Sequence, residues 1–319
     1  MPGPSITDVP AAIRFIGIKA QHLDVPVEIT NPSSFNAISE MISRSMEKQV
    51  DALFAVCQSS EMQFLSLQER VGLARFVVQQ VNGRIPVIAS GHISDDIGAQ
   101  KEELMAMAET GIDALVLVTN HLDPRNEGSD VFHATLDTLL AVLPATLPLG
   151  LYECPAPYRR LLSDDEFIWC ASSGRFVVLK DVSCDLPTVR RRVRLARGTP
   201  LNVINANAAI AWPAMQAGSQ GFSGVFTNFH PELYSWLWRE GKNQQALADE
   251  LAVFLSLAAV TETLGYPKNA KIYHQRLGTF DGVTCRVNQD DVLAKFGGLT
   301  VILDQIRTGT GQWRQRISG

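Results

Sequence analysis

Two short apolar runs each end in a residue that could take part in catalysis. Residues 147–152 end in the phenol of Tyr152, and residues 176–180 end in the amine of Lys180. A lysine that directly follows Val-Val-Leu lies where a buried strand meets its loop, so its ammonium should be partly desolvated. Burial disfavours the charged form and lowers the pKa, which leaves neutral amine to attack a carbonyl and form a Schiff base. The phenol of Tyr152, at the end of a neighbouring strand, could then move the proton. The alternative is a solvated Lys180 that caps a strand, beside a Tyr152 that belongs to the core.

The composition narrows the class of protein. The 319 residues are 46% hydrophobic and 19% charged, which suits one large α/β barrel, with two medium-sized domains as the rival. A net charge of −5 gives no reason to expect a nucleic-acid partner. Five cysteines without a C-x-x-C pair argue against a disulfide framework. No signal peptide is visible after Met1, and the longest apolar stretch, residues 251–260, is too short to cross a bilayer. We therefore expect a cytoplasmic protein with no membrane partner.

Strand-like and helix-like segments alternate along most of the chain. Strands are expected at residues 13–20, 52–57, 85–90, 113–119, 147–152, 176–180, 201–205 and 221–226. Helices are expected at residues 34–48, 66–81, 95–110, 130–143, 186–197, 208–217 and 231–239, and another after a capping box that begins at Ser163. This alternation predicts an α/β fold, a TIM (β/α)₈ barrel. A Rossmann-type sheet is the rival, but no G-x-G-x-x-G follows a predicted strand.

From about residue 244 only helices are predicted, at residues 246–264, 268–276 and 290–306. We interpret residues 1–242 as the barrel with a short N-terminal tail, and residues 243–319 as a C-terminal helical extension packed on the barrel. Barrel enzymes place their catalytic groups at the carboxyl ends of the strands. The strand ends here are residues 57–61, 91–92, 120–121, 152, 180, 205–207 and 223–224. Lys180 is the only lysine among them, which fits a single imine site.

The spacing of two short motifs resembles that of a known family. Tyr152-Glu-Cys-Pro155 is followed, 28 positions after the tyrosine, by Lys180-Asp-x-Ser-x-Asp185. This pattern resembles the dihydrodipicolinate synthase / N-acetylneuraminate lyase family, over about residues 34–278. The resemblance implies a TIM-barrel class I aldolase without a cofactor, in which Lys180 forms the imine with pyruvate or another 2-oxo acid and Tyr152 is the proton shuttle. It also implies a homo-oligomer, a tetramer or a dimer.

A 2-oxo acid needs its carboxylate held, which N–H groups and small hydroxyls in a tight turn can do. The resemblance assigns this role to the loop after the second strand, where the family has G-T-T-G-E and this chain has Gln58, Ser59 and Ser60 within residues 57–61. Ser59 matches the second threonine, and Gln58 replaces the first with a side chain too long for the same proton relay. Ala206 and Ser223 match positions at which family members approach the substrate through the backbone. The alternative is a polar loop without an anion site.

Two further departures concern the reaction. His121 and Leu122 stand where the synthases of the family carry a tyrosine pair, and Pro157 stands where they place an arginine for the aldehyde's carboxylate. Together with Gln58 they predict a lyase, an aldolase or a dehydratase, that is not a true dihydrodipicolinate synthase. The second substrate is not assigned by these positions.

Other patterns give competing hypotheses. One is a non-catalytic barrel that binds a 2-oxo acid. Another is a metal-dependent aldolase. Its candidate ligands lack the close spacing of zinc motifs, so no metal site is expected. These candidate ligands are Cys57, Cys154, Cys184, His92 and His121. The basic run at residues 190–197 is interpreted as a solvated helix face, not as a polyanion site.

Overall fold

Eight parallel strands lie side by side in chain order in the computed structural model, which describes residues 17–19 and 32–318. The strands are β1 (Gly17–Lys19), β2 (Ala52–Val56), β3 (Val87–Ser90), β4 (Ala114–Val118), β5 (Leu149–Tyr152), β6 (Phe176–Asp181), β7 (Asn202–Asn205) and β8 (Gly221–Phe222). Every residue of β2 to β6 is buried, as expected of parallel strands covered on both faces. The predicted strands are confirmed in number and order, and of the first, only residues 17–19 lie within the described chain.

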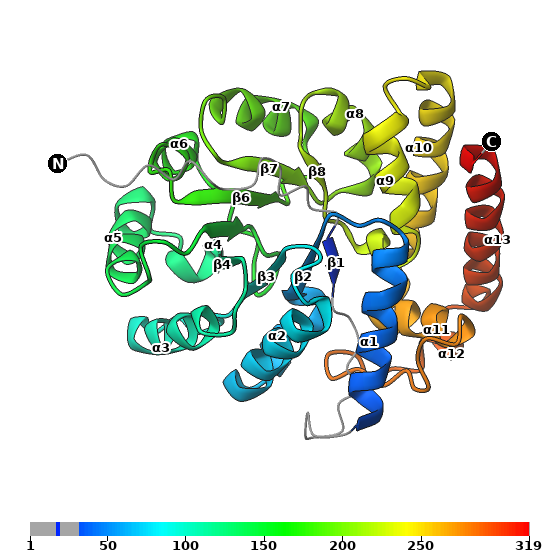
Figure 1. Ribbon diagram of the computed structural model, residues 1–319, viewed down its shortest axis with the longest axis horizontal. Helices are drawn as coiled ribbons and strands as arrows, with labels where there is room; N and C mark the ends of the chain where they lie inside the picture. Colours follow the sequence, from blue (N-terminus) through cyan, green and yellow to red (C-terminus); the bar gives the residue numbers. More distant parts are fainter. Residues whose placement is uncertain (1–16, 20–31, 319) are drawn as a thin grey trace.

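Helices connect the strands and surround the sheet (Figure 1). They are α1 (Pro32–Glu47), α2 (Leu67–Val81), α3 (Ile97–Ala108), α4 (Thr119–Leu122), α5 (Ser129–Leu140), α6 (Asp164–Ser172), α7 (Leu186–Leu195), α8 (Ala211–Gln216) and α9 (Pro231–Glu240). Ser66 caps α2 and Ser163 caps α6, each by accepting from the backbone N–H three residues on. Both predicted capping boxes are confirmed. None of the described helices is long and apolar enough to span a membrane.

The eighth strand is shorter than the sequence pattern predicts. A strand over residues 221–226 was expected, but β8 ends at Phe222 and the 3₁₀ turn η4 (Val225–Asn228) follows. A side chain on Gly224 would have its Cβ 2.5 Å from the carbonyl oxygen of Ala206, so the chain bends there against the loop after β7. The turn η4, which follows β8 at one edge of the sheet, contacts β1 at the other edge.

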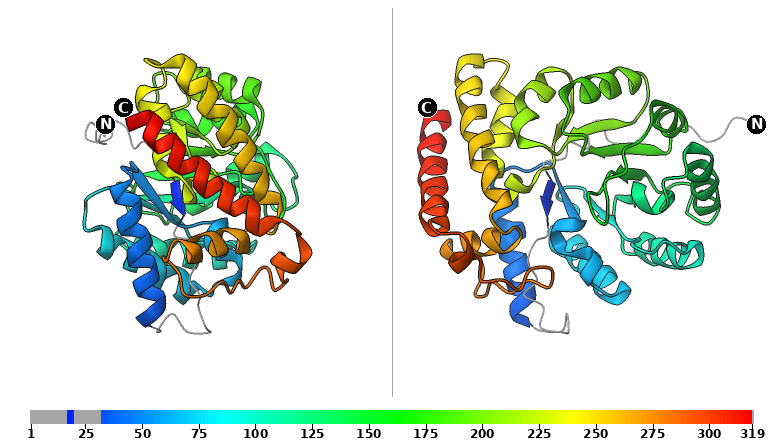
Figure 2. Two further views of the ribbon diagram at one scale, coloured as in Figure 1. Left: turned by 90° about the vertical axis from the view of Figure 1, so that its right-hand side faces the viewer. Right: turned by 180° about the vertical axis from the view of Figure 1, so that it is seen from behind.

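The C-terminal part consists of helices only, as predicted. They are α10 (Gln245–Ala259), η5 (Val260–Thr263), α11 (Lys268–Arg276), α12 (Val292–Lys295) and α13 (Leu299–Ser318). The prediction of a single helix at residues 290–306 is wrong, because Gly298 adopts φ +84° and separates α12 from α13. Figure 2 shows α13 lying across α10. These helices share one apolar core with α8 and α9, through residues such as Trp212, Leu233 and Leu251.

Candidate active site

Tyr152 and Lys180 lie side by side at the carboxyl ends of β5 and β6, where they are register partners. The Lys180 Nζ is 4.4 Å from the centroid of the Tyr152 ring and 5.5 Å from that of Phe54, and the two rings meet edge to face. Lys180 is 5% exposed and Tyr152 is 2% exposed. The residues that follow them, Glu153 and Asp181, contact Arg192 in the helix layer outside the sheet. Because successive side chains of a strand point to opposite faces, Tyr152 and Lys180 both point to the inner face. The amine and the phenol expected to act together are therefore adjacent and shielded from water.

The phenol of Tyr152 donates a hydrogen bond to Oε1 of Gln58, over 3.3 Å. The thiol of Cys154 also approaches this oxygen, with Sγ 3.9 Å away. Burial raises the pKa of Tyr152 well above its usual value, and the neighbouring thiols of Cys154 and Cys57 add to the rise. Tyr152 is therefore held as a neutral phenol that donates a proton to its neighbours. An amide oxygen accepts this hydrogen bond without a proton to pass on.

The loop after β2 forms the 3₁₀ turn η1 (Gln58–Ser60), and its serines differ in what they contact. The hydroxyl of Ser60 donates to the Cys57 carbonyl over 2.7 Å and accepts from the Cys57 N–H over 2.9 Å, and the Ser60 N–H also donates to that carbonyl. Ser60 therefore closes the turn, and its donors are occupied. Ser59 is buried and its hydroxyl faces Tyr266. Burial raises the pKa of Tyr266 well above its usual value, and the hydrogen bond with Ser59 partly opposes this rise.

The C-terminal helices support this loop through Glu61. Its Oε1 accepts the N–H of Val287 over 2.8 Å, and its Oε2 lies 3.5 Å from Nζ of the fully buried Lys271 on α11. Glu61 also adopts φ +57°, so the loop turns sharply at this residue. The helical extension thus fixes the turn that carries Gln58 and Ser59.

Ala206 and Ser223 follow β7 and β8, beside the same strand ends. The Ala206 N–H donates to the Asp181 carbonyl over 3.0 Å, and the Ser223 N–H donates to the Asn205 carbonyl over 2.8 Å. Both N–H groups thus continue the hydrogen bonding of the sheet. The Ala206 carbonyl and the Ser223 side chain are the groups that could contact a ligand. Ser223 and Lys180 line one small, otherwise apolar cavity inside the sheet.

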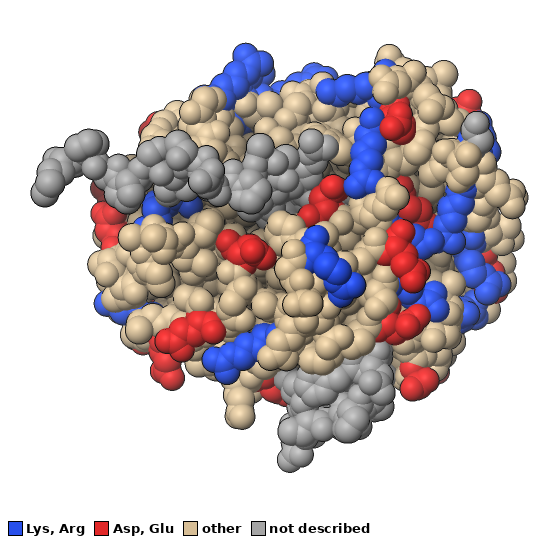
Figure 3. All heavy atoms as spheres, viewed as in Figure 1, with Lys and Arg blue, Asp and Glu red and all other residues tan. Residues whose placement is uncertain are grey.

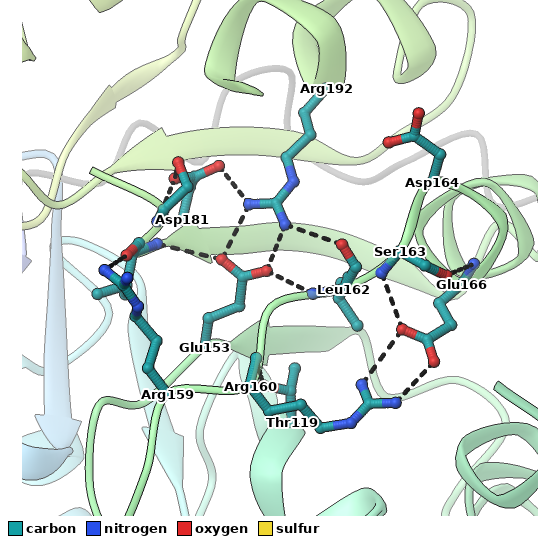
Figure 4. Close-up of polar contacts among 12 residues, drawn as sticks. Thr119, Glu153, Arg159, Arg160, Leu162, Ser163, Asp164, Glu166, Asp181 and Arg192 are labelled. Atoms are coloured by element: carbon teal, nitrogen blue, oxygen red, sulfur yellow. Dashed lines mark hydrogen bonds and ion pairs between the residues drawn. The ribbon is translucent and has the colours of Figure 1, made fainter. Parts of the chain in front are cut away.

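A buried arginine joins the two strands that carry Tyr152 and Lys180 (Figure 4). Arg192 on α7 contacts Glu153 through both Nη atoms, at 2.5 and 2.9 Å, and Asp181 at 2.5 Å. Glu153 in turn accepts the N–H groups of Leu162 and Val182. Burial raises the pKa of Glu153 above its usual value, with Arg192 opposing the rise and Asp181 adding to it. The residues that directly follow the phenol and the amine are thus held by one guanidinium.

This contact corrects the interpretation of the basic run as a solvated face. Arg190, Arg191 and Arg194 are exposed, but Arg192 is 1% exposed. Arg192 lies three positions after the buried Val189, which places it on the buried side of the helix. That spacing was visible in the sequence, whereas its two acidic partners come from other elements.

A second buried arginine lies in the loop after β5. Arg160 contacts Asp123 at 3.0 Å and Glu166 at 2.7 Å, and all three side chains are almost completely buried. Burial alone would raise the pKa of Asp123, but hydrogen bonds from backbone N–H groups and from Arg160 outweigh it and lower that pKa. Arg160 stands three positions after Pro157 and is held by these carboxylates, so it ties loops together.

The histidines proposed as metal ligands are hydrogen-bonded within the protein. Nε2 of the fully buried His92 accepts the Val118 N–H over 2.6 Å, and its Nδ1 lies 3.1 Å from Oε1 of Gln100. Nδ1 of His121 contacts Asp95 at 2.8 Å, whereas its buried Nε2 has no hydrogen-bond partner among the described residues. Since Val118 N–H is a donor, His92 is neutral with its proton on Nδ1, and both of its nitrogens are engaged.

The described residues contain no group of three or more His, Cys, Asp or Glu side chains that could hold a metal ion. Cys57 and Cys154 are buried and Cys184 is exposed, all as free thiols. On the face drawn in Figure 3, acidic and basic side chains are interspersed.

The sequence and the fold were compared with known proteins. The model of the dihydrodipicolinate synthetase family matches residues 23–288. The 4-hydroxy-tetrahydrodipicolinate synthase of Thioalkalivibrio sulfidiphilus is 27% identical over 237 residues, which are 74% of this chain and 78% of that protein. The enzyme of the same name from Bacillus subtilis is 28% identical over 198 residues, 60% of this chain and 64% of that protein.

Solved structures of similar fold cover more of the chain. A prophage protein of the dihydrodipicolinic acid synthase family from E. coli K12, in complex with pyruvate, superposes with a TM-score of 0.77 at 19% identity, over 93% of this chain and 99% of that one. CdNal from Clostridium difficile, in complex with mannosamine, gives 0.75 at 17% identity, over 86% and 92%. At these identities the likeness concerns the fold.

Proposed function

Because the chain belongs to the dihydrodipicolinate synthetase family, whose members include synthases and lyases, we propose that it is a class I lyase acting on pyruvate or another 2-oxo acid through a Schiff base at Lys180. One observation carries the proposal: Lys180 and Tyr152 are aligned at adjacent strand ends, with Nζ 4.4 Å from the phenol ring. Two of the related structures were solved with pyruvate, one of them a dihydrodipicolinate synthase from Acinetobacter baumannii.

The proposed reaction begins when the neutral amine of Lys180 attacks the 2-oxo carbon. The carbinolamine loses water and leaves a protonated imine, which withdraws electrons from the neighbouring carbon. Loss of a proton from that carbon, or cleavage of its bond to the next carbon, then gives an enamine. Tyr152 supplies and removes the protons, since its phenol is buried beside the amine. Water finally hydrolyses the imine and restores the free lysine.

The substrate carboxylate is assigned to the turn after β2. The Ser59 hydroxyl and the first N–H groups of η1 are the donors that we propose for it. Ser60 has the supporting role of closing the turn through Cys57, and Gln58 orients the phenol of Tyr152. Ala206 and Ser223 would border the substrate on the side of β7 and β8. Neither the aldolase nor the dehydratase reaction requires a cofactor in this scheme.

We propose further that the sheet closes as a TIM (β/α)₈ barrel, residues 1–242, on which residues 243–319 pack as an extension. The contact between β1 and η4 supports closure, and the apolar core shared by α8 to α11 and α13 supports the packing. A homo-oligomer remains a prediction from the resemblance.

Borohydride trapping tests the proposed chemistry. The protein is incubated with pyruvate, reduced, digested and analysed by mass spectrometry, because reduction converts the imine into a stable secondary amine. We expect one adduct per chain, on the peptide that contains Lys180, and none in Lys180→Ala. The peptide of Lys271, an equally buried lysine that contacts Glu61, serves as the internal control and should stay unlabelled.

Tyr152→Phe should form the same adduct more slowly, by about 10²–10⁴-fold, since it lacks the proton-transferring group. A label with a longer 2-oxo acid but not with pyruvate would retain the mechanism and change the substrate. No label with any 2-oxo acid would favour the non-catalytic barrel, which the altered loop of Gln58 to Ser60 already suggests.

A further inference from the structure

A hollow of about 260 Å³ lies on the catalytic face, beside the end of β6. Its walls come from three consecutive loops, those after β6, β7 and β8, and from the end of α10. A size of this order is close to the lower end of the usual range for small-molecule sites, roughly 300–1,000 Å³. The loops carry Val182, Ala206, Ala208, Ala209, Val225 and Phe226 into the hollow.

The hollow adjoins Lys180 through the chain segments on either side of it. Val182 lines the hollow two residues after Lys180, and Val225 lines it two residues after Ser223, which borders the Lys180 cavity. Ala206 donates its N–H to the residue that follows Lys180, and Gly224 packs against its carbonyl. A molecule joined to the imine carbon would extend past Ala206 into this space.

The lining is chemically uniform. Six alanine, valine and phenylalanine side chains of the loops are joined there by Ala259, Val260 and a few small polar groups. Glu262 is the one charged residue among the described lining residues. No lysine or arginine belongs to that described lining. A carboxylate or phosphate would therefore lose water there without a cation in return and would meet the Glu262 carboxylate.

Resting on the proposed Lys180 chemistry, we propose that this hollow binds the second reactant, and that this reactant is an uncharged, apolar aldehyde with an aromatic or branched side chain. In the condensation direction, the enamine carbon of bound pyruvate forms a bond to the aldehyde carbon. The aldehyde oxygen takes up the proton that Tyr152 donates, and water hydrolyses the imine. The product is a 4-hydroxy-2-oxo acid with an apolar tail, and cleavage is the same sequence in reverse.

A matched pair of aldehydes tests the proposal. Pyruvate is combined with benzaldehyde or with 4-carboxybenzaldehyde, which differ by one carboxylate on the same ring. We expect kcat/KM to favour benzaldehyde by roughly 10–100-fold, since the carboxylate has no partner in the hollow. Equal rates, or a preference for 4-carboxybenzaldehyde, would overturn the proposal.

A charge introduced into the hollow should reverse the preference. Ala209 is exposed at the wall, so Ala209→Arg supplies a guanidinium for a carboxylate and should raise kcat/KM for 4-carboxybenzaldehyde about tenfold. Ala141→Arg, at the exposed end of α5, is the matched control and should leave both rates unchanged. The same gain in both variants would contradict the assignment of the site.

Cys184 offers an independent readout, because it lines the hollow and is the exposed one of the five cysteines. Alkylation with N-phenylmaleimide should abolish condensation with benzaldehyde while borohydride still traps pyruvate on Lys180. Cys184→Ser, treated in the same way, should keep the activity of its own untreated sample. Pyruvate trapping without condensation of any aldehyde would overturn the inference alone, whereas failure of trapping would overturn the proposed function itself.

Discussion

The phenol of Tyr152 and the side-chain oxygen of Gln58 are 3.3 Å apart, in a contact that joins residues 94 positions apart in the chain. Gln58 therefore orients the phenol that we propose as the proton-transferring group, by accepting its hydrogen bond. An amide oxygen has no proton to release, so the proton that Tyr152 gives up must go to the bound substrate itself or to its immediate neighbours.

A double-mutant cycle tests this contact. Gln58→Met removes the acceptor and should slow pyruvate trapping by about 2–10-fold, the kinetic equivalent of one net hydrogen bond. In the Tyr152→Phe background the same substitution should have almost no effect, because the phenol that it orients is absent. Additive losses would mean that Gln58 acts on the substrate without Tyr152.

The chain should be a poor dihydrodipicolinate synthase. Pro157 offers no cation for the second carboxylate, and Arg160 nearby is already bound to Asp123 and Glu166. With pyruvate and aspartate semialdehyde in a coupled assay, we expect kcat below about 1 s⁻¹, the low end of the common enzyme range. The Thioalkalivibrio sulfidiphilus relative, assayed in parallel, controls for the quality of the substrate. A rate equal to that of the relative would refute this prediction.

Two adjacent arginines of α7 should differ sharply in their effect on stability. Arg192→Met leaves the carboxylates of Glu153 and Asp181 buried without their cation, which should cost about 3–5 kcal/mol of unfolding free energy. Arg191→Met breaks a half-exposed pair with Asp164 and should cost less than about 1 kcal/mol. Urea unfolding of both variants measures the difference, and similar losses would contradict the buried ion pair as the cause.

The stability of the protein should fall in mild acid, and His92 should contribute to the fall. Burial, with His121 adding to the effect, lowers the pKa of His92 to about 3. Its Nε2 accepts the Val118 N–H. Below about pH 6.5, the ordinary pKa of histidine, His92 therefore binds a proton in the unfolded state but not in the folded state. Its contribution to stability is present at neutral pH and is lost as the pH falls.

The expected slope from this one residue is about 1.4 kcal/mol per pH unit. His92→Gln, which removes the titrating group, should reduce the slope of unfolding free energy between roughly pH 6 and pH 5 by that amount. His230 and His274, which are also buried, should keep their own contributions in the variant. An unchanged slope would show that His92 does not titrate on unfolding.

The sequence by itself determined the order of the elements and the ends of most of them. Alternating apolar runs marked the buried strands, and Ser66 and Ser163 marked the starts of α2 and α6, because these signals lie within a few neighbouring residues. The identity of Lys180 as the lysine at a strand end also followed from the chain alone. These features depend on residues that lie close together in the chain, so they can be predicted from the sequence alone.

The tertiary structure alone decided which groups meet. Gln58 contacts Tyr152, and Ser60 turns back to Cys57. Arg192 is buried between Glu153 and Asp181, although Arg191 beside it is exposed. These contacts depend on the register of β5 against β6 and on the way α7 packs outside them. They were not predictable from spacing, because the partners lie on different elements and only packing brings them within reach. The length of β8 was settled in the same way, by the close approach of Gly224 to a carbonyl of another loop.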